Sequence, residues 1–375
     1  MQTVKVSCLS VLVAALAGCG GGGGGSSSTS TPTPTPAPPP APSITTQQRI
    51  DAATSTATNN AACTSITPFY WEIGDATGAL ASGTGGDNST TAPNSATQME
   101  IASASKWIFG AYALERTPYA TIKSTNDING NSEINYLNFT SGYDNSSAAC
   151  TIQTTVGACF NGASLKGGHN SDFHAADVGK FFYNSSHLQA YANNIVSLGG
   201  YYDSNSGGSP VLADEIRRLI GQEIMLSYSN PTLAGGVTTD AADYAIFLRK
   251  ILNGGLQMSQ YLDADKVCAW TNMSDCNALY SPVNQSIEGA VNNVSDEKWH
   301  YSIAHWVEDD PTDGDGTYSS PGAFGFYPWI DSSKTYYGII ARHDAGIHIA
   351  SQPAYITSAY CGRLIRKAWL QGAAQ

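Results

Sequence analysis

Charged side chains are scarce in this chain: Asp, Glu, Lys and Arg make up 13% of its 375 residues. The 30 acidic residues outnumber the 18 basic ones, and the formal net charge at pH 7 is -12. A surface of this sign repels polyanions, so the composition argues against nucleic acid as a partner. The chain is long enough to bury a large core in one or two domains without help from metal or oligomerisation.

Two motifs of enzyme and metal chemistry are also missing. No Gly-x-Ser-x-Gly sequence occurs, which argues against a Ser-His-Asp enzyme with a nucleophile elbow. No Cys-x-x-Cys occurs, and the pairs His169/His174 and His343/His348 are spaced i, i+5, so neither pair faces one side of a helix. Neither pair encloses the glutamate that metalloprotease chemistry requires. We therefore expect no metal ion and no cofactor.

The first 19 residues resemble the export signal of bacterial lipoproteins. Lys5 supplies a positive charge, residues 9–17 form a short apolar core, and the sequence Leu-Ala-Gly-Cys that ends at Cys19 matches the lipobox. The resemblance implies that Cys19 becomes a lipidated N-terminus, anchoring the protein in the bacterial cell envelope at the outer membrane or facing the periplasm. The apolar core is too short to span a bilayer permanently. The alternative is an ordinary cleaved signal peptide.

Residues 20–43 consist of glycines, then serine and threonine, then alternating Thr-Pro and Ala-Pro pairs. Such a composition buries no apolar area and forms a tether. The folded domain is therefore expected to span residues 44–375.

Six cysteines remain outside the signal and the lipobox, and they allow 15 connectivities. Close spacing suggests two local loops and leaves one long-range bridge. The expected pairs are Cys150–Cys159, Cys268–Cys276 and Cys63–Cys361. The long-range bridge requires the N-terminal and C-terminal helices to be adjacent.

A serine and a lysine lie one helical turn apart in the segment Met99–Ile108, where a short strand leads into a helix. Apolar residues recur from Trp107 at the i, i+4, i+7 spacing of a helix face. The helix is expected to open with Ser103, which places Ser103 and Lys106 on the same side.

This spacing suits nucleophilic catalysis. A serine hydroxyl becomes a good nucleophile only when a neighbouring base removes its proton. A helix N-terminus adds a partial positive charge and free N–H groups for a developing anion. Lys106 could be that base, or could hold one, if burial lowers its pKa by roughly 3 to 5 units. Ser-x-x-Lys alone is common by chance, so the interpretation depends on motifs further along the chain.

The remaining pattern places strands near both ends of the domain and helices between them. The expected strands span residues 68–74, 79–82, 300–307, 322–330 and 336–341. Helices are expected at 44–60 and 355–370, with a mostly helical insert at about 115–255 that includes a helix with its N-cap at Thr239. We expect an α/β (α+β) fold with one antiparallel sheet.

Five segments form an ordered set of motifs along the chain. They are Ile101-Ala102-Ser103-Ala104-Ser105-Lys106, Phe139-Thr140-Ser141-Gly142, Phe181-x-Tyr183-x-Ser185, Gly235-Gly236-x-Thr238-Thr239-x-x-x-Asp243 and Ser320-Pro321-Gly322-Ala323-Phe324-Gly325. In this order they resemble the motifs of the class C β-lactamase-like serine hydrolases. That group includes penicillin-binding D,D-peptidases, family VIII carboxylesterases and aminohexanoate-oligomer hydrolases. The similarity covers roughly residues 44–370. It implies the serine β-lactamase/D,D-peptidase-like fold, an antiparallel sheet flanked by terminal helices, with the active site in a cleft beside the helical insert.

The resemblance assigns roles to residues at matching positions. Ser103 corresponds to the acylated nucleophile, Lys106 to the base or the group that tunes it, and Tyr183 to the tyrosine that passes a proton to the leaving group. The backbone N–H groups of Ser103 and Ala323 correspond to the oxyanion hole. Which of Lys106 and Tyr183 acts as the general base stays open.

Substrate contacts are expected at Ser185, Ser320 and Gly322, and two of these depart from the family pattern. Ser185 replaces the asparagine of Tyr-x-Asn, and Ser320 stands where relatives carry lysine or histidine. In lactamases and D,D-peptidases that lysine helps to hold a substrate carboxylate. Its loss favours small or oligomeric neutral esters or amides over anionic substrates.

The sequence thus predicts a serine hydrolase of the cell envelope that works through an acyl-enzyme. The alternatives are a peptidoglycan D,D-peptidase or β-lactamase, and a non-catalytic envelope protein that keeps the fold for binding. His305, His343 and Trp306 could line the pocket or be ordinary strand residues. Substrate identity stays open, because loops such as 83–97 and 309–318 shape the cleft. The oligomeric state also stays open.

Overall fold

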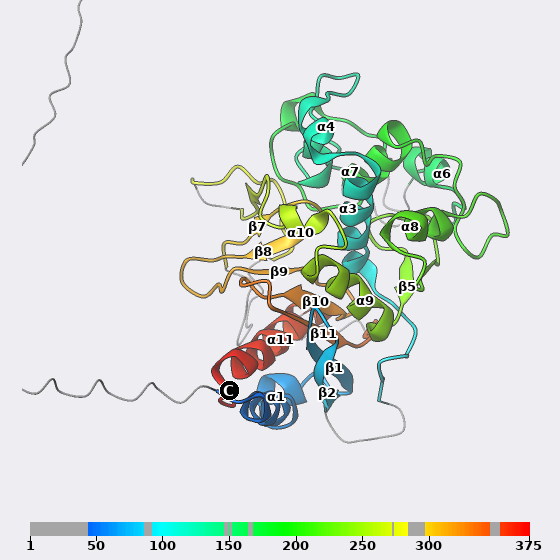
Figure 1. Cartoon of the computed structure of the whole chain (residues 1–375). Helices are drawn as coiled ribbons and strands as arrows, with labels where there is room; N and C mark the ends of the chain where they lie inside the picture. The colour runs from blue at the N-terminus through cyan, green and yellow to red at the C-terminus, as the bar shows by residue number, and fades with distance from the viewer. Residues whose placement is uncertain are drawn as a thin grey trace, which may run out of the picture. The chain divides into compact units, whose positions relative to one another are not determined.

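The computed structural model of the chain describes residues 44–85, 92–145, 150, 152–163, 168–271, 274–283, 297–345 and 353–375 (Figure 1). The predicted signal, the lipidation site Cys19, the linker and His348 lie outside these residues. The segment Ile44–Gln375 forms one structural unit. Among its described helices, none combines the length and apolar character that crossing a membrane requires.

A large sheet joins the two ends of this unit. Among the described residues it has eight strands in the order β2-β1-β11-β10-β9-β8-β7-β6, each antiparallel to its neighbours. The strands are β1 (Phe69–Asp75), β2 (Ala79–Gly85), β6 (Val267–Cys268), β7 (His300–Tyr301), β8 (Trp306–Glu308), β9 (Thr317–Ser319), β10 (Tyr327–Ile330) and β11 (Tyr336–Ala341). The N-terminal hairpin therefore pairs with the last strand, from Tyr70 opposite Ala341 to Asp75 opposite Tyr336. The predicted antiparallel sheet, closed by the chain ends, is confirmed.

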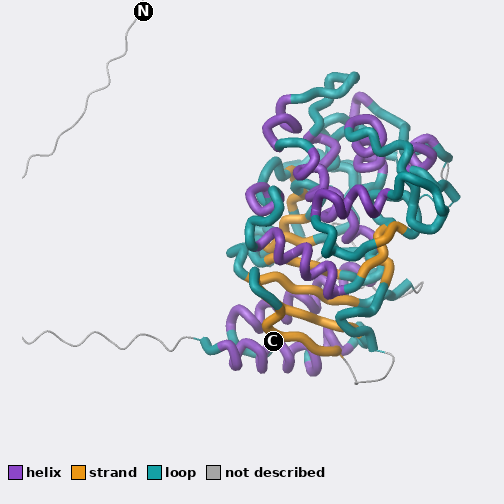
Figure 2. The backbone as a smooth tube through the Cα atoms, turned by 45° about the vertical axis from the view of Figure 1, so that its right-hand side comes forward, coloured by secondary structure: helices purple, strands orange, loops and turns teal. Residues whose placement is uncertain are grey.

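Helices cover both faces of the sheet (Figure 2). Because neighbouring strand residues point to opposite faces, Tyr336 and Tyr337 of β11 show what lies on each side. The Tyr336 ring meets Trp369 of α11 (Ala354–Gln371) at 5.6 Å, and the Tyr337 hydroxyl accepts a hydrogen bond from Arg249 of α9 (Ala241–Leu252) at 3.0 Å. Helix α1 (Thr46–Asn59) lies beside α11, so the two terminal helices flank the sheet as predicted.

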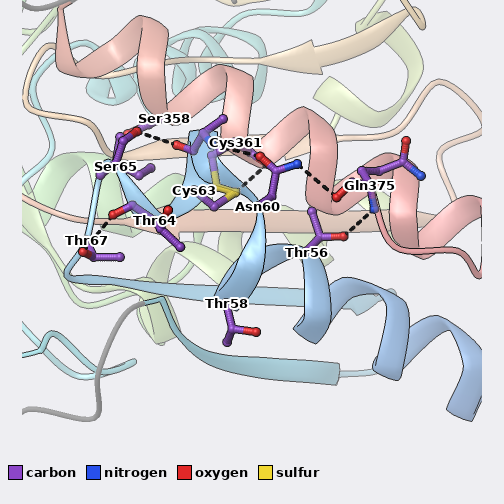
Figure 3. Close-up of a disulfide and its surroundings, with 12 residues drawn as sticks. Thr56, Thr58, Asn60, Cys63, Thr64, Ser65, Thr67, Ser358, Cys361 and Gln375 are labelled. Atoms are coloured by element: carbon purple, nitrogen blue, oxygen red, sulfur yellow. Dashed lines mark hydrogen bonds between the residues drawn. A yellow bond between two sulfur atoms is a disulfide. The ribbon is translucent and has the colours of Figure 1, made fainter.

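A disulfide ties α11 to the segment that follows α1 (Figure 3). Cys63, in the short helix α2 (Ala61–Thr64), is bonded to Cys361, 298 residues later in the chain. Beside it, the Asn60 amide donates a hydrogen bond to the Gln375 carbonyl, and the Gln375 N–H donates to the Thr56 hydroxyl, both at 3.0 Å. The other two predicted bridges also form and are Cys150–Cys159 and Cys268–Cys276.

The segment between β2 and β6 is mostly helical, as predicted for the insert (Figure 1). Besides α9, its helices are η1 (Ala102–Ala104), α3 (Ser105–Arg116), α4 (Tyr119–Ser124), α5 (Ile134–Leu137), α6 (Val156–Asn161), η2 (Ala175–Asp177), α7 (Ser186–Ala190), the π-turn η3 (Tyr191–Ile195), α8 (Leu212–Ile220) and α10 (Met258–Tyr261). A small sheet in the order β3-β5-β4 joins β3 (Met99–Glu100), β5 (Val237–Thr239) and β4 (Ser227–Tyr228).

The N-cap of α9 differs from the prediction. Thr239 belongs to β5 and pairs with Met99, which fixes it in the strand ladder. The N-cap is Asp240, whose carboxylate accepts a hydrogen bond from the Asp243 N–H at 2.9 Å. The prediction of Thr239 was wrong because the strand pairing that claims it involves a segment 140 residues earlier.

The expected strand at 300–307 is a hairpin of two strands, β7 and β8. Ala304, between them, has φ 56°, a left-handed conformation that breaks a strand. Its N–H donates to the Leu137 carbonyl at 2.8 Å, so a contact with the insert holds the reversal in place.

Candidate active site

Ser103 lies on the 3-10 turn η1 at the end of β3, and α3 begins two residues later, at Ser105, rather than at Ser103 as expected. Ala102 has φ 44°, which costs a non-glycine residue about 1 kcal/mol or more. The Ser105 hydroxyl offsets this by donating to the Ala102 carbonyl at 2.6 Å and accepting from the Val237 N–H at 3.2 Å. The turn is therefore held by β5, and it presents Ser103 to a cavity.

Lys106 is buried beside this turn, with only 3% of its surface exposed. Its side-chain nitrogen donates hydrogen bonds to Ser103 Oγ and to the Ala234 carbonyl, each at 3.0 Å. Neither partner carries a charge, so burial lowers the pKa of Lys106 to about 7. A lysine with this pKa is partly neutral near pH 7 and can accept the proton of the serine.

Tyr183 packs on the other side of Lys106. The lysine nitrogen lies 4.6 Å from the centre of the Tyr183 ring, and the ring stacks on Trp306 at 5.1 Å. Burial raises the pKa of Tyr183 to about 12, and a hydrogen bond with Ser103 opposes this rise. The structure thus brings Ser103, Lys106 and Tyr183 together. The Lys106 amine meets the face of the Tyr183 ring, whereas the Tyr183 hydroxyl is hydrogen-bonded to Ser103.

A buried histidine, which the sequence did not single out, supports the segment that carries Tyr183. His187 Nδ1 lies 2.7 Å from the Ser141 hydroxyl and Nε2 lies 2.9 Å from the Phe182 carbonyl. Burial lowers the pKa of His187 to about 3, so the ring is neutral. The hydroxyl must then donate to Nδ1, and Nε2–H donates to the carbonyl. Through this bridge, His187 connects the segment around Phe139 and Ser141 to the segment that carries Tyr183.

The two residues after Tyr183 both line the cavity, and Asn184 also holds the neighbouring backbone. The Asn184 amide donates hydrogen bonds to the carbonyls of Tyr143 and Asn145, both at 2.8 Å. Ser185 lines the cavity beside it. Ser185, the shorter side chain at the third position of the tyrosine motif, therefore borders the space next to Ser103.

Ser320 and Gly322 lie behind the nucleophile. Ser320 is 2% exposed, and its hydroxyl donates to the backbone carbonyl of Ser103 at 3.1 Å. A Cβ atom on Gly322 would lie 2.1 Å from the Ile101 carbonyl oxygen, so only glycine fits there. These two predicted substrate contacts support the nucleophile turn, whereas Ala323 lines the cavity together with Ser103.

The cavity at Ser103 has a volume of about 430 Å³, within the usual range for small-molecule sites. Aromatic and apolar side chains dominate its walls, and among the described residues that line it none is Asp, Glu, Lys, Arg or His. Its lining residues are Ser103, Phe182, Tyr183, Asn184, Ser185, Tyr280, Pro282, Val283, Trp299, Trp306, Pro321, Ala323, Tyr355, Ile356 and Ala359.

Of the three additional candidates near the third motif, only Trp306 lines this cavity. His305 is fully buried, stacks on Trp107 of α3 at 5.2 Å and places its ring nitrogens 2.8 Å from two backbone carbonyls. His343 lies in a separate hollow, 4.0 Å from a carboxylate oxygen of Glu100. Both histidines are therefore outside the site around Ser103.

One group of side chains in the described part of the chain has the spacing of a metal site, namely Asp144, His174 and Asp177. Asp144 contacts His174 directly, and Lys180 forms an ion pair with Asp177 at 2.8 Å. Asp144 and His174 are thus paired with each other and Asp177 with Lys180, and none of the three lines the cavity at Ser103.

Neither a protein-family model nor a curated protein sequence matches this chain. Solved structures do. A Bacteroides dorei protein assigned as a β-lactamase superposes with a TM-score of 0.56 at 18% identity, covering 81% of this chain and 93% of that one. EstCE1, a hydrolase with promiscuous acyltransferase activity, gives 0.53 at 14% identity over 87% and 100%. A β-lactamase from Mycobacterium bovis gives 0.52 at 12% identity over 82% and 96%.

The chain therefore has the fold of the β-lactamase-like serine hydrolases, as the motif order predicted. At these identities the likeness concerns the fold, and the chemistry has to be argued from the residues of this chain.

Proposed function

We propose that the protein is a serine hydrolase that cleaves uncharged esters or amides through an acyl-enzyme. The observation that carries this proposal is the 3.0 Å hydrogen bond between a buried lysine, Lys106, and the hydroxyl of Ser103 at the edge of a cavity. The fold supports it, because the similar structures named above include a hydrolase and β-lactamases.

In this mechanism Lys106 is the base and Tyr183 relays the proton. Neutral Lys106 takes the proton of Ser103 as Oγ attacks the substrate carbonyl, and the backbone N–H groups of Ser103 and Ala323 hold the oxyanion. The leaving group receives a proton from the Tyr183 hydroxyl, which regains one from the Lys106 ammonium after the amine moves from the face of the Tyr183 ring to its hydroxyl. Water then releases the acyl group by the same proton path in reverse. Tyr183 suits a relay rather than a base, since a pKa of about 12 keeps it protonated.

Uncharged substrates fit the cavity best. Ser320 carries no positive charge, and its hydroxyl is hydrogen-bonded to the backbone carbonyl of Ser103. Among the described residues that line the cavity, none has a positively charged side chain that could pair with a substrate carboxylate. A D,D-peptidase or β-lactamase function would need such a group for efficient binding of its anionic substrates. We therefore place these functions second.

We also propose that the protein works in the cell envelope, held by a lipid on Cys19. The three disulfides in the described residues fit an oxidising compartment. Metabolic labelling with a lipid precursor, compared between the native chain and Cys19→Ala, tests this anchor. Unchanged labelling of the variant would contradict it.

A fluorophosphonate probe tests the nucleophile. The wild-type protein should be labelled and Ser103→Ala should not, while Ser65→Ala, which changes an exposed serine outside the cavity lining, should label normally. Absence of label on the wild type would support the second alternative, a non-catalytic binding protein. A substrate panel tests the class: faster turnover of a cephalosporin than of nitrophenyl acetate would refute the preference for neutral esters.

A further inference from the structure

Residues 279–283, which carry no recognisable motif, form one wall of the cavity through Tyr280, Pro282 and Val283. They run alongside the segment that carries Tyr183, as a short parallel bridge. The Leu279 N–H donates to the Phe181 carbonyl at 2.8 Å, and the Tyr183 N–H donates to the Tyr280 carbonyl at 3.1 Å. These backbone hydrogen bonds therefore fix the position of the wall relative to Tyr183.

The same segment is attached at two further points. Tyr355 of α11 donates its hydroxyl hydrogen bond to the Pro282 carbonyl at 2.9 Å. Upstream, the disulfide between Cys268 and Cys276 joins the chain just before this segment to strand β6. A wall held by the sheet, by the Tyr183 segment and by α11 is preorganised, so little entropy is lost when a ligand packs against it.

Aromatic rings make up much of the surface that this wall completes. The Tyr280 ring lies 5.3 Å from the Phe182 ring, at an interplanar angle of 36°. Trp306 connects the Tyr183 ring to Trp299, with centroid distances of 5.1 and 5.9 Å. Tyr280 lines the cavity and is 37% exposed, so part of its surface is open to a ligand. Such rings attract another ring by about 0.5 to 1.5 kcal/mol beyond the burial of area.

Charged ligands are disfavoured. Basic groups already occupy the faces of two of these rings, with the Lys106 amine 4.6 Å from the Tyr183 centroid and the Arg363 guanidinium 5.7 Å from the Trp299 centroid. A cationic ligand would compete with them for the same π electrons. An anionic ligand gains little from Arg363, because Glu297 and Glu308 already pair with it at 2.6 and 3.2 Å.

We propose that the cavity binds an uncharged aromatic group next to the scissile carbonyl, and that Tyr280 is a specificity-determining residue for it. This inference rests on the proposed hydrolase function and names its substrate class, which is aryl or arylalkyl esters and amides.

Binding of simple alcohols to Ser103→Ala, which cannot turn over substrate, tests the cavity separately from the chemistry. Calorimetric titration should show tighter binding of 3-phenylpropanol than of 3-cyclohexylpropanol, 3-phenylpropanoate or a phenylpropyl trimethylammonium ion. Adding Tyr280→Leu, which keeps apolar volume but removes the ring, should weaken binding of the phenyl alcohol by about 2- to 13-fold. Tyr280→Phe should keep the binding, and Leu279→Ala, at an exposed neighbour outside the lining, should leave it unchanged.

The outcomes separate the two proposals. Equal binding of the phenyl and cyclohexyl alcohols, or no effect of Tyr280→Leu in a variant whose thermal unfolding is unchanged, would overturn the aromatic site. If the active protein cleaves nitrophenyl esters but shows no preference for a phenylpropanoyl over a cyclohexylpropanoyl group, the hydrolase function stands and the aromatic site fails. If phenylpropanol binds while fluorophosphonate labelling fails, the aromatic site stands and the hydrolase function fails.

Discussion

The pH dependence of ester hydrolysis should report the pKa of Lys106. At the ordinary pKa of 10.5, only about one lysine in 3,000 would be neutral at pH 7. A pKa of about 7 leaves half of the molecules with a neutral Lys106. Burial therefore increases the population of the neutral base by about 1,600-fold, which corresponds to about 4 kcal/mol. Since only neutral Lys106 accepts the serine proton, kcat/KM should rise tenfold per pH unit below pH 7 and level off above it.

The assay is kcat/KM for nitrophenyl acetate across the neutral range, with Lys106→Met as the comparison. Loss of the base should lower kcat/KM by about 10²- to 10⁴-fold and remove the acid limb. The buried histidines His187 and His305 cannot produce a limb near 7, because burial lowers their pKa values to about 3 and about 4. A midpoint near 10, or the same acid limb in Lys106→Met, would refute the assignment of Lys106 as the base.

The same shift has a consequence for stability. Between pH 7 and 10.5 the unfolded chain binds a proton at Lys106 that the folded chain does not, so this lysine makes the free energy of unfolding rise with pH in that window. Below pH 7 the folded protein carries the full cost of a buried ammonium. Lys106→Met should therefore be more stable than the wild type at pH 6, by up to a few kcal/mol (about 2 to 5), and the difference should shrink as pH rises towards 10.5. Urea unfolding at several pH values measures this, and a pH-independent difference would contradict it.

Three further predictions concern the supports of the site. Gly322→Ala places a Cβ 2.1 Å from the Ile101 carbonyl oxygen and should lower kcat by about tenfold or more. Ester turnover measures this effect, and circular dichroism checks that the fold is unchanged. Normal turnover would contradict the close packing. His187→Leu leaves a hydroxyl and a carbonyl without their ring partners and should cost about 2 to 5 kcal/mol in urea unfolding, a result that a solvent-exposed ring would not give. Replacing Cys63 and Cys361 by alanine should cost about 2 to 5 kcal/mol, and an unchanged Tm would show that the bridge adds nothing to stability.

Several features followed from the sequence because they depend on local spacing or on simple elimination. The pairs Cys150–Cys159 and Cys268–Cys276 are close in the chain, and their assignment left Cys63–Cys361 as the only remaining pair. The strands of the last hairpin, on either side of residues 331–334, also follow from their patterns.

Features that depend on distant segments were harder to predict. Thr239 resembles an N-cap in its own sequence, but its pairing with Met99 makes it a strand residue. His187 gives no local signal of its role, because both of its partners, Ser141 and the Phe182 carbonyl, are defined only when α7 packs against the loop around Phe139. Residues 279–283 show no catalytic motif, and their backbone pairing with residues 181–183 and the Tyr355 hydrogen bond to Pro282 bring them to the cavity.

The sequence by itself determined that Ser103 and Lys106 face each other, because one helical turn sets their separation, and it determined the order of elements that builds the sheet. Tertiary structure alone decided that Lys106 is dry enough for a pKa of about 7, that its amine meets the face of the Tyr183 ring, and that aromatic rings enclose the cavity. The physical reason is that desolvation depends on every segment that covers a group. The segments that surround this site include helix α11, which is far from Ser103 in the chain.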